Sequence, residues 1–186
     1  MARRRTITPP RKMKPAILVV CEGETEEAYL DFLRHQYRCP IKIVSKILGD
    51  DINERRIKSL QDSMKVSGND IVYTFLMYDR DVAAMNDKID KLSGVKLCSN
   101  PCVELWFLLH ISAIHSPLST KQCIEHLRQH NVFWGNYEKA FLSLKQKECL
   151  WSNRLTAVSN AKLLLEGKNP SSTVYRLIEF LETRRK

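Results

Sequence analysis

Two apolar runs, broken only by Thr74, constrain the fold of this 186-residue chain more than any other feature of its sequence. Residues 16–21 form the first run and residues 71–78 the second, and an acid, Glu22 or Asp79, follows each run at once. A short apolar run without alternation is typical of a strand that is buried on both faces, as in a parallel sheet. The two runs therefore predict a sheet that is covered by helices on both sides.

Strand-like and helix-like segments alternate through the first hundred residues. Because a strand–helix–strand connection usually places its two strands in parallel, this alternation predicts an α/β fold with a mostly parallel sheet flanked by helices. The first helix is expected to have Thr25 as its N-cap. The expected strands are residues 16–20, 41–48, 71–78 and 95–98, and further helices are expected along Ile57, Leu60 and Met64 and over 83–92.

The second half of the sequence has the pattern of a helical region. Ser99, Asn100 and Pro101 predict the start of the apolar helix "CVELWFLLHI", because a capping residue is followed by proline at the first turn. Ser119 and Gln122 predict a capping box before another helix. Later helices are expected at about 136–148, 153–166 and 172–183.

Positive charge is concentrated at the two ends of the chain. Residues 1–14 hold six lysines and arginines and no acid, and the three basic residues 184–186 complete the formal net charge of +9. We expect residues 1–14 to be a flexible arm that binds a polyanion or only aids solubility. The expected nucleic-acid contacts in this arm are Arg3, Arg4, Arg5, Arg11 and Lys12. The remaining residues, 15–186, are expected to form one domain, with an α/β core over about 15–115 and a helical extension over about 116–186.

Composition favours a cytoplasmic protein. No apolar window approaches the length of a membrane span, and the six cysteines show no CxxC pair, which suits reduced and packed thiols. One alternative is a zinc site, because Cys123, His126 and His130 fall at helical spacing on one face. A fourth ligand is not evident, and such residues on amphipathic helices are usually structural.

The acids that follow the apolar runs each have an ordinary explanation. Acids in the first turn of a helix compensate its dipole, which accounts for Glu26. A capped turn accounts for Asp79 and Asp81, and a buried ion pair accounts for Glu104 in its apolar helix. Their combination is harder to explain, since the carboxyl ends of neighbouring parallel strands share one edge of a sheet.

Phosphoryl transfer with a divalent metal ion requires such a set of acids. Mg²⁺ takes carboxylate oxygens as ligands, and a D-x-D pair after a strand sends both side chains to the same side. The metal ion neutralises phosphate charge and activates water, and a further carboxylate serves as a second metal ligand or a general base. The acids therefore predict a Mg²⁺ or Mn²⁺ site.

Three stretches of this sequence resemble the RloB-like family, which is related to Toprim (topoisomerase–primase) domains. They are "CEGETEEAYLDFL", "MYDRDV" and "SNPCVELWFLLH", and the resemblance runs from about residue 15 to the end of the chain. Val103 departs from the family pattern, which has an aromatic residue at this packing position. The resemblance implies a Toprim-like α/β core, a helical C-terminal half and a role in antiphage defence beside an ATPase of the AAA or ABC type.

The resemblance also implies roles for individual acids. Glu22, Asp79 and Asp81 match the catalytic and metal-binding acids of Toprim nucleases, Glu26 matches a second acid of the first motif, and Glu104 matches an acid after a serine. Lys139 is an expected phosphate contact, and the expected supporting residues are Gly23, Thr25, Ser99, Asn100 and Tyr137.

The leading interpretation is a metal-dependent nuclease acting on DNA or RNA. Two alternatives remain open: a nucleic-acid-binding subunit of an ATPase complex that cleaves nothing, and a nucleotidyl transferase of the primase type. A homo-oligomer is compatible with each, and none of them requires a membrane.

Overall fold

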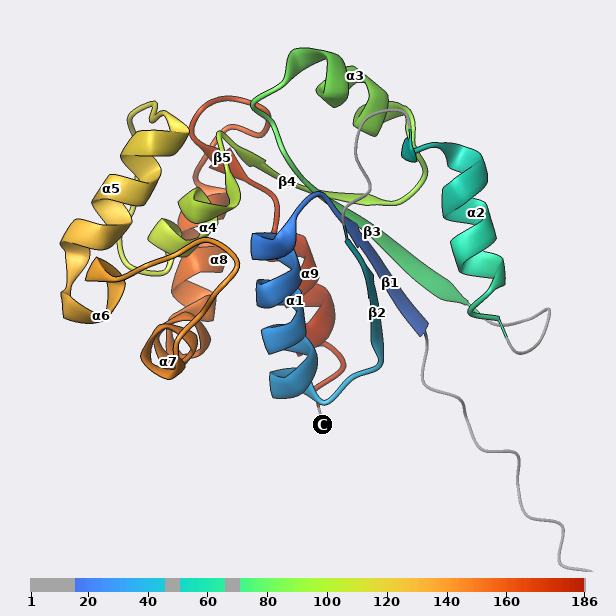
Figure 1. Ribbon diagram of the computed structural model, residues 1–186, viewed down its shortest axis with the longest axis horizontal. Helices are drawn as coiled ribbons and strands as arrows, with labels where there is room; N and C mark the ends of the chain where they lie inside the picture. Colours follow the sequence, from blue (N-terminus) through green and yellow to red (C-terminus); the bar gives the residue numbers. More distant parts are fainter. Residues whose placement is uncertain (1–15, 46–50, 66–70, 186) are drawn as a thin grey trace, which may run out of the picture.

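The computed structural model describes residues 16–45, 51–65 and 71–185, which form a five-stranded sheet with helices on both faces (Figure 1). The flexible arm expected over residues 1–14 lies outside the described residues. The first elements are β1 (Ala16–Cys21), α1 (Glu24–Tyr37), β2 (Ile41–Val44), α2 (Glu54–Asp62), β3 (Val72–Asp79), α3 (Ala83–Lys91) and β4 (Val95–Asn100). The elements that follow are α4 (Val103–Leu109), α5 (Thr120–His130), α6 (Val132–Gly135), α7 (Leu144–Ser152), α8 (Arg154–Lys162), β5 (Ser171–Ser172) and α9 (Tyr175–Glu182).

The sheet has the strand order β2-β1-β3-β4-β5, and the first four of these strands are parallel. Only β5 pairs in the antiparallel sense, against β4. Cys21 is the register partner of Met77, and Asp79 that of Ser99, so β1, β3 and β4 end at one edge. The predicted α/β class with a mostly parallel sheet and a helical second half is confirmed.

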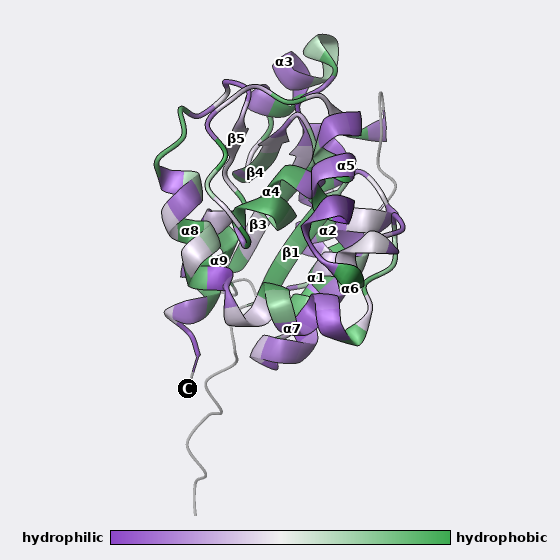
Figure 2. Cartoon of the chain, turned by 90° about the vertical axis from the view of Figure 1, so that its left-hand side faces the viewer, coloured by the Kyte–Doolittle hydropathy of each residue, from purple (hydrophilic) through white to green (hydrophobic). Residues whose placement is uncertain are grey.

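The two faces of the sheet carry separate buried clusters. Side chains of Ile17, Val19 and Phe75 pack with α1, α4 and α9, whereas Leu18 and Leu76 pack with α2 and α3 on the other face. Alternate residues of a strand point to opposite faces, so β1 is apolar on both and needs helices on both. Hydropathy colouring shows α4 and the central strands as apolar and the outer helices as largely polar (Figure 2). Helix α9 shares its core with β1, so the helical half is not packed separately from the sheet.

Several predicted boundaries are wrong, each for a local reason. The N-cap of α1 is Gly23 rather than Thr25, and Ser99 and Asn100 end β4 instead of starting α4, whose N-cap is Cys102. The Ser119–Gln122 capping box is confirmed, and a second one stands before α7. Because of this second box, the helix expected over 136–148 begins only at Leu144 and ends at Ser152. The helix expected over 172–183 begins at Tyr175, because β5 occupies Ser171–Ser172. Part of the strand expected over 41–48 lies outside the described residues; β2 ends at Val44.

Within the described ranges, no helix has the length and apolarity to cross a membrane.

Candidate functional site

Six acids line one cleft of about 360 Å³ at the edge where the parallel strands end. The walls of the cleft come from five segments. They are the residues just before α1, the first turn of α1, the end of β3 with the residues after it, the first turn of α4 and the loop before α7. Lys139 is the one cation that the described residues place in the lining. The acids are Glu22, Glu24, Glu26, Asp79, Asp81 and Glu104.

Glu22 joins the ends of β1 and β3. Its backbone N–H donates to the carbonyl oxygen of Met77 at 3.2 Å, and its Oε2 accepts the backbone N–H of Asp79 at 3.2 Å. Burial raises the pKa of Glu22, the Asp79 N–H partly offsets this, and the charge of Asp81 raises the pKa further. The carboxylate of Glu22 is thus held beside Asp79 by the strand register itself.

The acids of the D-x-D pair line the cleft and the residue between them does not. Arg80 donates its backbone N–H to the carbonyl oxygen of Ser99 at 2.8 Å, while its guanidinium pairs with Asp90 at the end of α3. Asp79 and Asp81 therefore share the opposite side, as alternation along a strand predicts. Burial raises the pKa of Asp79 well above its ordinary value, and the negative charges of the other cleft acids add to this shift.

Glu26 has a structural role as well as a place in the cleft. It is 5% exposed, burial raises its pKa, and backbone N–H groups of Gly23 and of Glu26 itself bond to its carboxylate and lower the pKa. This is the return half of a capping box, in which the third helical residue reaches back to the N-cap. A Cβ at Gly23 would stand 3.0 Å from Glu26 Oε2, so glycine leaves room for this contact.

Glu104 is the most deeply placed of the acids. It has no exposed surface, Tyr137 donates its hydroxyl to Oε1 at 3.0 Å, and Lys139 Nζ lies 3.8 Å from the same oxygen. Its other oxygen, Oε2, is buried and has no hydrogen-bond partner among the described residues. A buried carboxylate oxygen without a partner is costly, and a bound cation would remove that cost.

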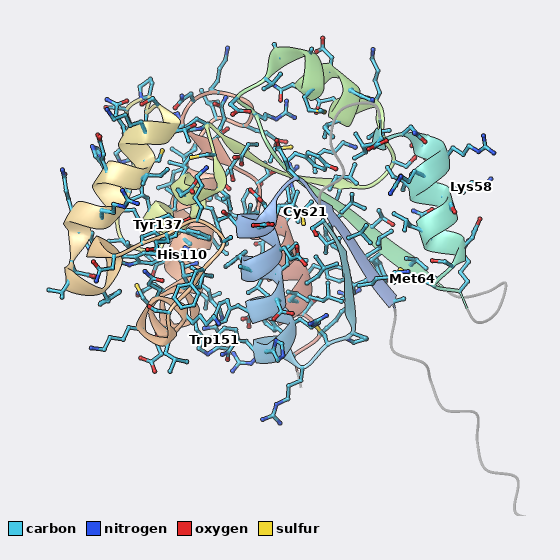
Figure 3. The ribbon with its side chains drawn as sticks, viewed as in Figure 1. Cys21, Lys58, Met64, His110, Tyr137 and Trp151 are labelled. Carbon is cyan, nitrogen blue, oxygen red and sulfur yellow. The ribbon has the colours of Figure 1, made fainter. Side chains whose placement is uncertain are left out.

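The loop over residues 136–143 completes the cleft and holds residues that the sequence placed far from the acids. Ala140 has a left-handed backbone with φ 64°, and its N–H donates to Thr25 Oγ1 at 3.1 Å, which ties the loop to α1. Tyr137 and Lys139 reach Glu104 from this loop. Figure 3 labels Tyr137 on the α4 side of α1, with Cys21, the last residue of β1, near the top of α1.

Other expected site residues lie elsewhere. Ser99 is buried against Ser172, with 2.9 Å between their hydroxyl oxygens, and the Asn100 side chain donates to the carbonyl oxygen of Gly167 at 3.3 Å. Neither of them lines the cleft. Sequence reasoning did not select Glu24, which does line it, because an acid in a first turn is fully explained by the helix dipole. The expected contacts Arg3, Arg4, Arg5, Arg11 and Lys12 lie outside the described residues.

The cleft acids do not form a finished ligand sphere. Within residues 16–45, 51–65 and 71–185, no group of three or more His, Cys, Asp and Glu side chains is placed to hold a metal ion. The acidic donors nevertheless suit a hard divalent cation, since they are carboxylates and one buried oxygen lacks a partner among the described residues. Burial, together with the charge of the other cleft acids, also raises the pKa of Asp79.

The alternative zinc site does not assemble among the described residues. Cys123 is buried and hydrogen-bonded to the thiol of Cys102, whereas His126 and His130 are exposed. The three side chains therefore do not face one common point, although they share a helix.

Comparison with known proteins gives a family. No curated protein and no solved structure matches the chain. A family model described as RloB-like protein matches residues 17–181, which include the cleft acids, α4 and most of α9. Because this match covers far more than half of the sequence, the chain belongs to the RloB-like protein family.

Proposed function

We propose that this protein is a metal-dependent nuclease that hydrolyses phosphodiester bonds of DNA or RNA by Toprim-type chemistry. The observation that carries the proposal is the gathering of six carboxylates from separate elements around one small cleft. Folding buries Asp79 and brings the other cleft acids close to it, and both effects raise its pKa, so the carboxylates are gathered at a cost in free energy. A function that uses a cation explains why the sequence keeps them there.

The cleft residues have separate tasks in this proposal. Glu22, Asp79 and Asp81 hold a Mg²⁺ or Mn²⁺ ion, and Glu26 and Glu104 support it or hold a second one. When bound, the ion neutralises phosphate charge and makes water a better nucleophile. Lys139 contacts a phosphate oxygen, and Tyr137 orients Glu104 through its hydroxyl. Glu22, held beside Asp79, is the candidate general base.

The biological setting is part of the same proposal. We expect the nuclease to act in antiphage defence together with an ATPase of the AAA or ABC type. Support comes from family membership alone.

A cleavage assay tests the proposal. The full chain is incubated with plasmid DNA, single-stranded DNA and structured RNA, with Mg²⁺, with Mn²⁺ or with EDTA, and with and without an ATPase encoded beside it. We expect metal-dependent cleavage of at least one substrate, reduced by about a hundredfold or more in Asp79→Asn, which corresponds to roughly 3 kcal/mol. The matched control is Asp87→Asn, which removes an exposed carboxylate of α3 and is expected to leave cleavage unchanged.

A second candidate function is a subunit that binds nucleic acid for an ATPase and cleaves nothing. It is favoured by the absence of a finished ligand group among the described residues. If wild-type protein cleaves no substrate under any of these conditions yet binds nucleic acid, this second function replaces the first.

A further inference from the structure

A second cavity, of about 820 Å³, lies at the opposite end of the sheet from the acid cleft. Ile17 lines it near the start of β1. The remaining walls come from residues 36–40 at the end of α1 and just after it, from Trp151 of α7 and from residues 183–185 after α9. Ile17 and Glu22 are five residues apart on an extended strand, which separates the two cavities by about 16 Å along β1. Figure 3 shows Trp151 beside the lower half of α1, away from Cys21. Cavities of this size hold ligands as large as a nucleotide.

The walls of this cavity, the arginine pocket, carry an excess of positive charge. Arg38, Arg184 and Arg185 line the pocket, and no acid lines it among the described residues. Arg154 lies 4.2 Å above the ring of the lining residue Trp151. Among the described residues, the acid that pairs with these arginines is Glu182 in the last turn of α9, at 2.6 Å from Arg154 and 3.9 Å from Arg185.

Helix ends do not cancel this excess. The C-termini of α1, α7 and α9 point toward the pocket, and each contributes a partial charge of about −0.5. Four guanidinium groups therefore face one carboxylate and about −1.5 from helix ends, which leaves about +1.5. The described walls of the pocket thus carry a net positive charge that would attract an anion.

Two of the four arginines are already committed to structural contacts. Arg184 donates to the carbonyl oxygen of Phe180 at 3.1 Å and lies 3.6 Å above its ring, and Arg154 holds Glu182 and the carbonyl oxygen of Trp151. Arg38 is exposed, and its side chain makes no ion pair or hydrogen bond with any residue in the described ranges. Arg38 is therefore the group most available to an incoming anion. Arg185 is the next, because its one ion pair, with Glu182, is long at 3.9 Å.

The pocket also offers aromatic surface. Trp151 is half-buried, the ring of Tyr37 meets it edge-on at 5.1 Å, and the guanidinium of Arg185 lies 5.0 Å from its ring centroid. Aromatic rings and guanidinium planes are the surfaces on which nucleobases stack, while free guanidinium nitrogens bind phosphate. The same few side chains thus suit both halves of a nucleotide.

The chain's own N-terminal segment is an unsuitable occupant. It joins β1 at Ala16, one residue from the pocket wall, but residues 1–14 are basic throughout and would add to the positive charge. We propose that the arginine pocket binds a nucleoside phosphate, either a free nucleotide or the phosphorylated end of a single strand. Its phosphate lies against Arg38 and Arg185, and its base lies against Trp151. This inference does not depend on the chemistry of the acid cleft.

Calorimetric titration of the full chain tests the proposal with four probes: AMP, inorganic phosphate, and a ten-nucleotide thymidine strand with and without a 5′-phosphate. We expect AMP to bind more tightly than inorganic phosphate, because only AMP carries a base. Tighter binding of the phosphorylated strand than of AMP identifies a strand end as the ligand. Equal binding of the two strands, with AMP bound more tightly than either, identifies a free nucleotide.

Variants locate the binding. Arg38→Glu and Arg185→Gln are each expected to weaken AMP binding by about tenfold, the loss of one charge-assisted contact. Trp151→Phe is expected to weaken AMP binding but not phosphate binding. The matched control is Lys58→Glu on α2, which makes the same charge change as Arg38→Glu at an exposed site far from the pocket and is expected to alter affinity less than twofold (Figure 3). Unchanged melting temperatures check that all variants fold.

Three outcomes overturn the proposal. Failure of AMP and of both strands to bind at millimolar concentration removes the site. Equal weakening by Lys58→Glu and Arg38→Glu shows general attraction to a basic protein. Equal affinity for inorganic phosphate and AMP removes the role given to Trp151. Each result is independent of whether the protein cleaves nucleic acid.

Discussion

The two ends of the sheet carry opposite charge. In the part of the chain that the structure describes, six acids and one lysine line the cleft at the carboxyl ends of the strands, whereas three arginines and no acid line the pocket at the amino ends. At both places the end of α1 has a partial charge opposite to that of the nearby side chains. Its positive N-terminus lies at the acid cleft, and its negative C-terminus lies at the arginine pocket. At the acid cleft the dipole lowers the cost of gathering acids, and at the arginine pocket it lowers the cost of gathering arginines. Each end of the sheet therefore gathers side chains of one charge next to a helix end of the opposite charge.

The largest expected effect is a gain in stability when a divalent cation is added, and it should depend on the acid cleft but not on the arginine pocket. At a Mg²⁺ concentration about a hundredfold above its dissociation constant, a site present only in the folded state adds about 2.7 kcal/mol to the free energy of unfolding. We expect urea unfolding to show this gain in wild type and in Arg38→Glu, and to show little of it in Asp79→Asn. Equal stabilisation of all three proteins would place the cation outside the acid cleft and break the comparison.

A second effect concerns the basic segment that precedes β1. Deleting residues 1–14 removes six positive charges and none of the cleft acids. If all six contact phosphates, the slope of log affinity against log salt for a single strand becomes shallower by about 4 units. We expect weaker binding, retained cleavage at high substrate concentration and unchanged sequence preference, because phosphate contacts carry no base information.

Binding of the truncated chain is measured against plain duplex and single-stranded oligonucleotides over a range of salt concentrations. An unchanged slope would show that the segment does not touch nucleic acid. The docking of this segment on an acidic surface of an ATPase partner would then be the better hypothesis.

The smallest effect is a pH dependence of stability that only the acid cleft produces. The folded-state pKa of Asp79 is raised, so its contribution to stability is fully present below the unfolded value of about 3.8. That contribution is lost as pH rises through the folded value. We therefore expect Asp79→Asn to be more stable than wild type near pH 8, without metal, and this advantage to shrink as pH falls.

The measurement is the difference in unfolding free energy between the two proteins from pH 5 to pH 8. Taking the difference cancels the contribution of His110 to the pH dependence, which is common to both proteins. Burial lowers the pKa of His110 to about 4, so its contribution to stability is lost as pH falls below about 6.5, the opposite direction to that of Asp79. An advantage of Asp79→Asn that does not change with pH would mean that Asp79 is charged at all these values.

The sequence predicted those parts of the site whose position follows from the order of strands and helices along the chain. Glu22 and Asp79 follow buried strands, and parallel strands end at one edge, so their meeting required no knowledge of packing. Tyr137 and Lys139 were also expected at the site, but their contacts with Glu104 could not be predicted, because these depend on a left-handed turn at Ala140 and on its bond to Thr25. No sequence period encodes such a loop.

Other elements escaped sequence reasoning for related reasons. The two-residue strand β5 is too short to produce alternation, and it takes its partner from β4 across more than seventy residues. The arginine pocket is assembled from three helix ends that lie far apart in the sequence. In each case tertiary packing, rather than propensity or periodicity, decides which residues meet.

The position of Arg80 between two cleft acids sets a limit on how this chain can vary in length. Because neighbouring residues of an extended strand face opposite ways, inserting or deleting one residue within β3 would turn the Arg80 guanidinium into the cleft and both aspartates out of it. Such a change would replace two negative charges by one positive charge without altering a single side chain. Insertions in related sequences should therefore spare β3 and its first two following residues.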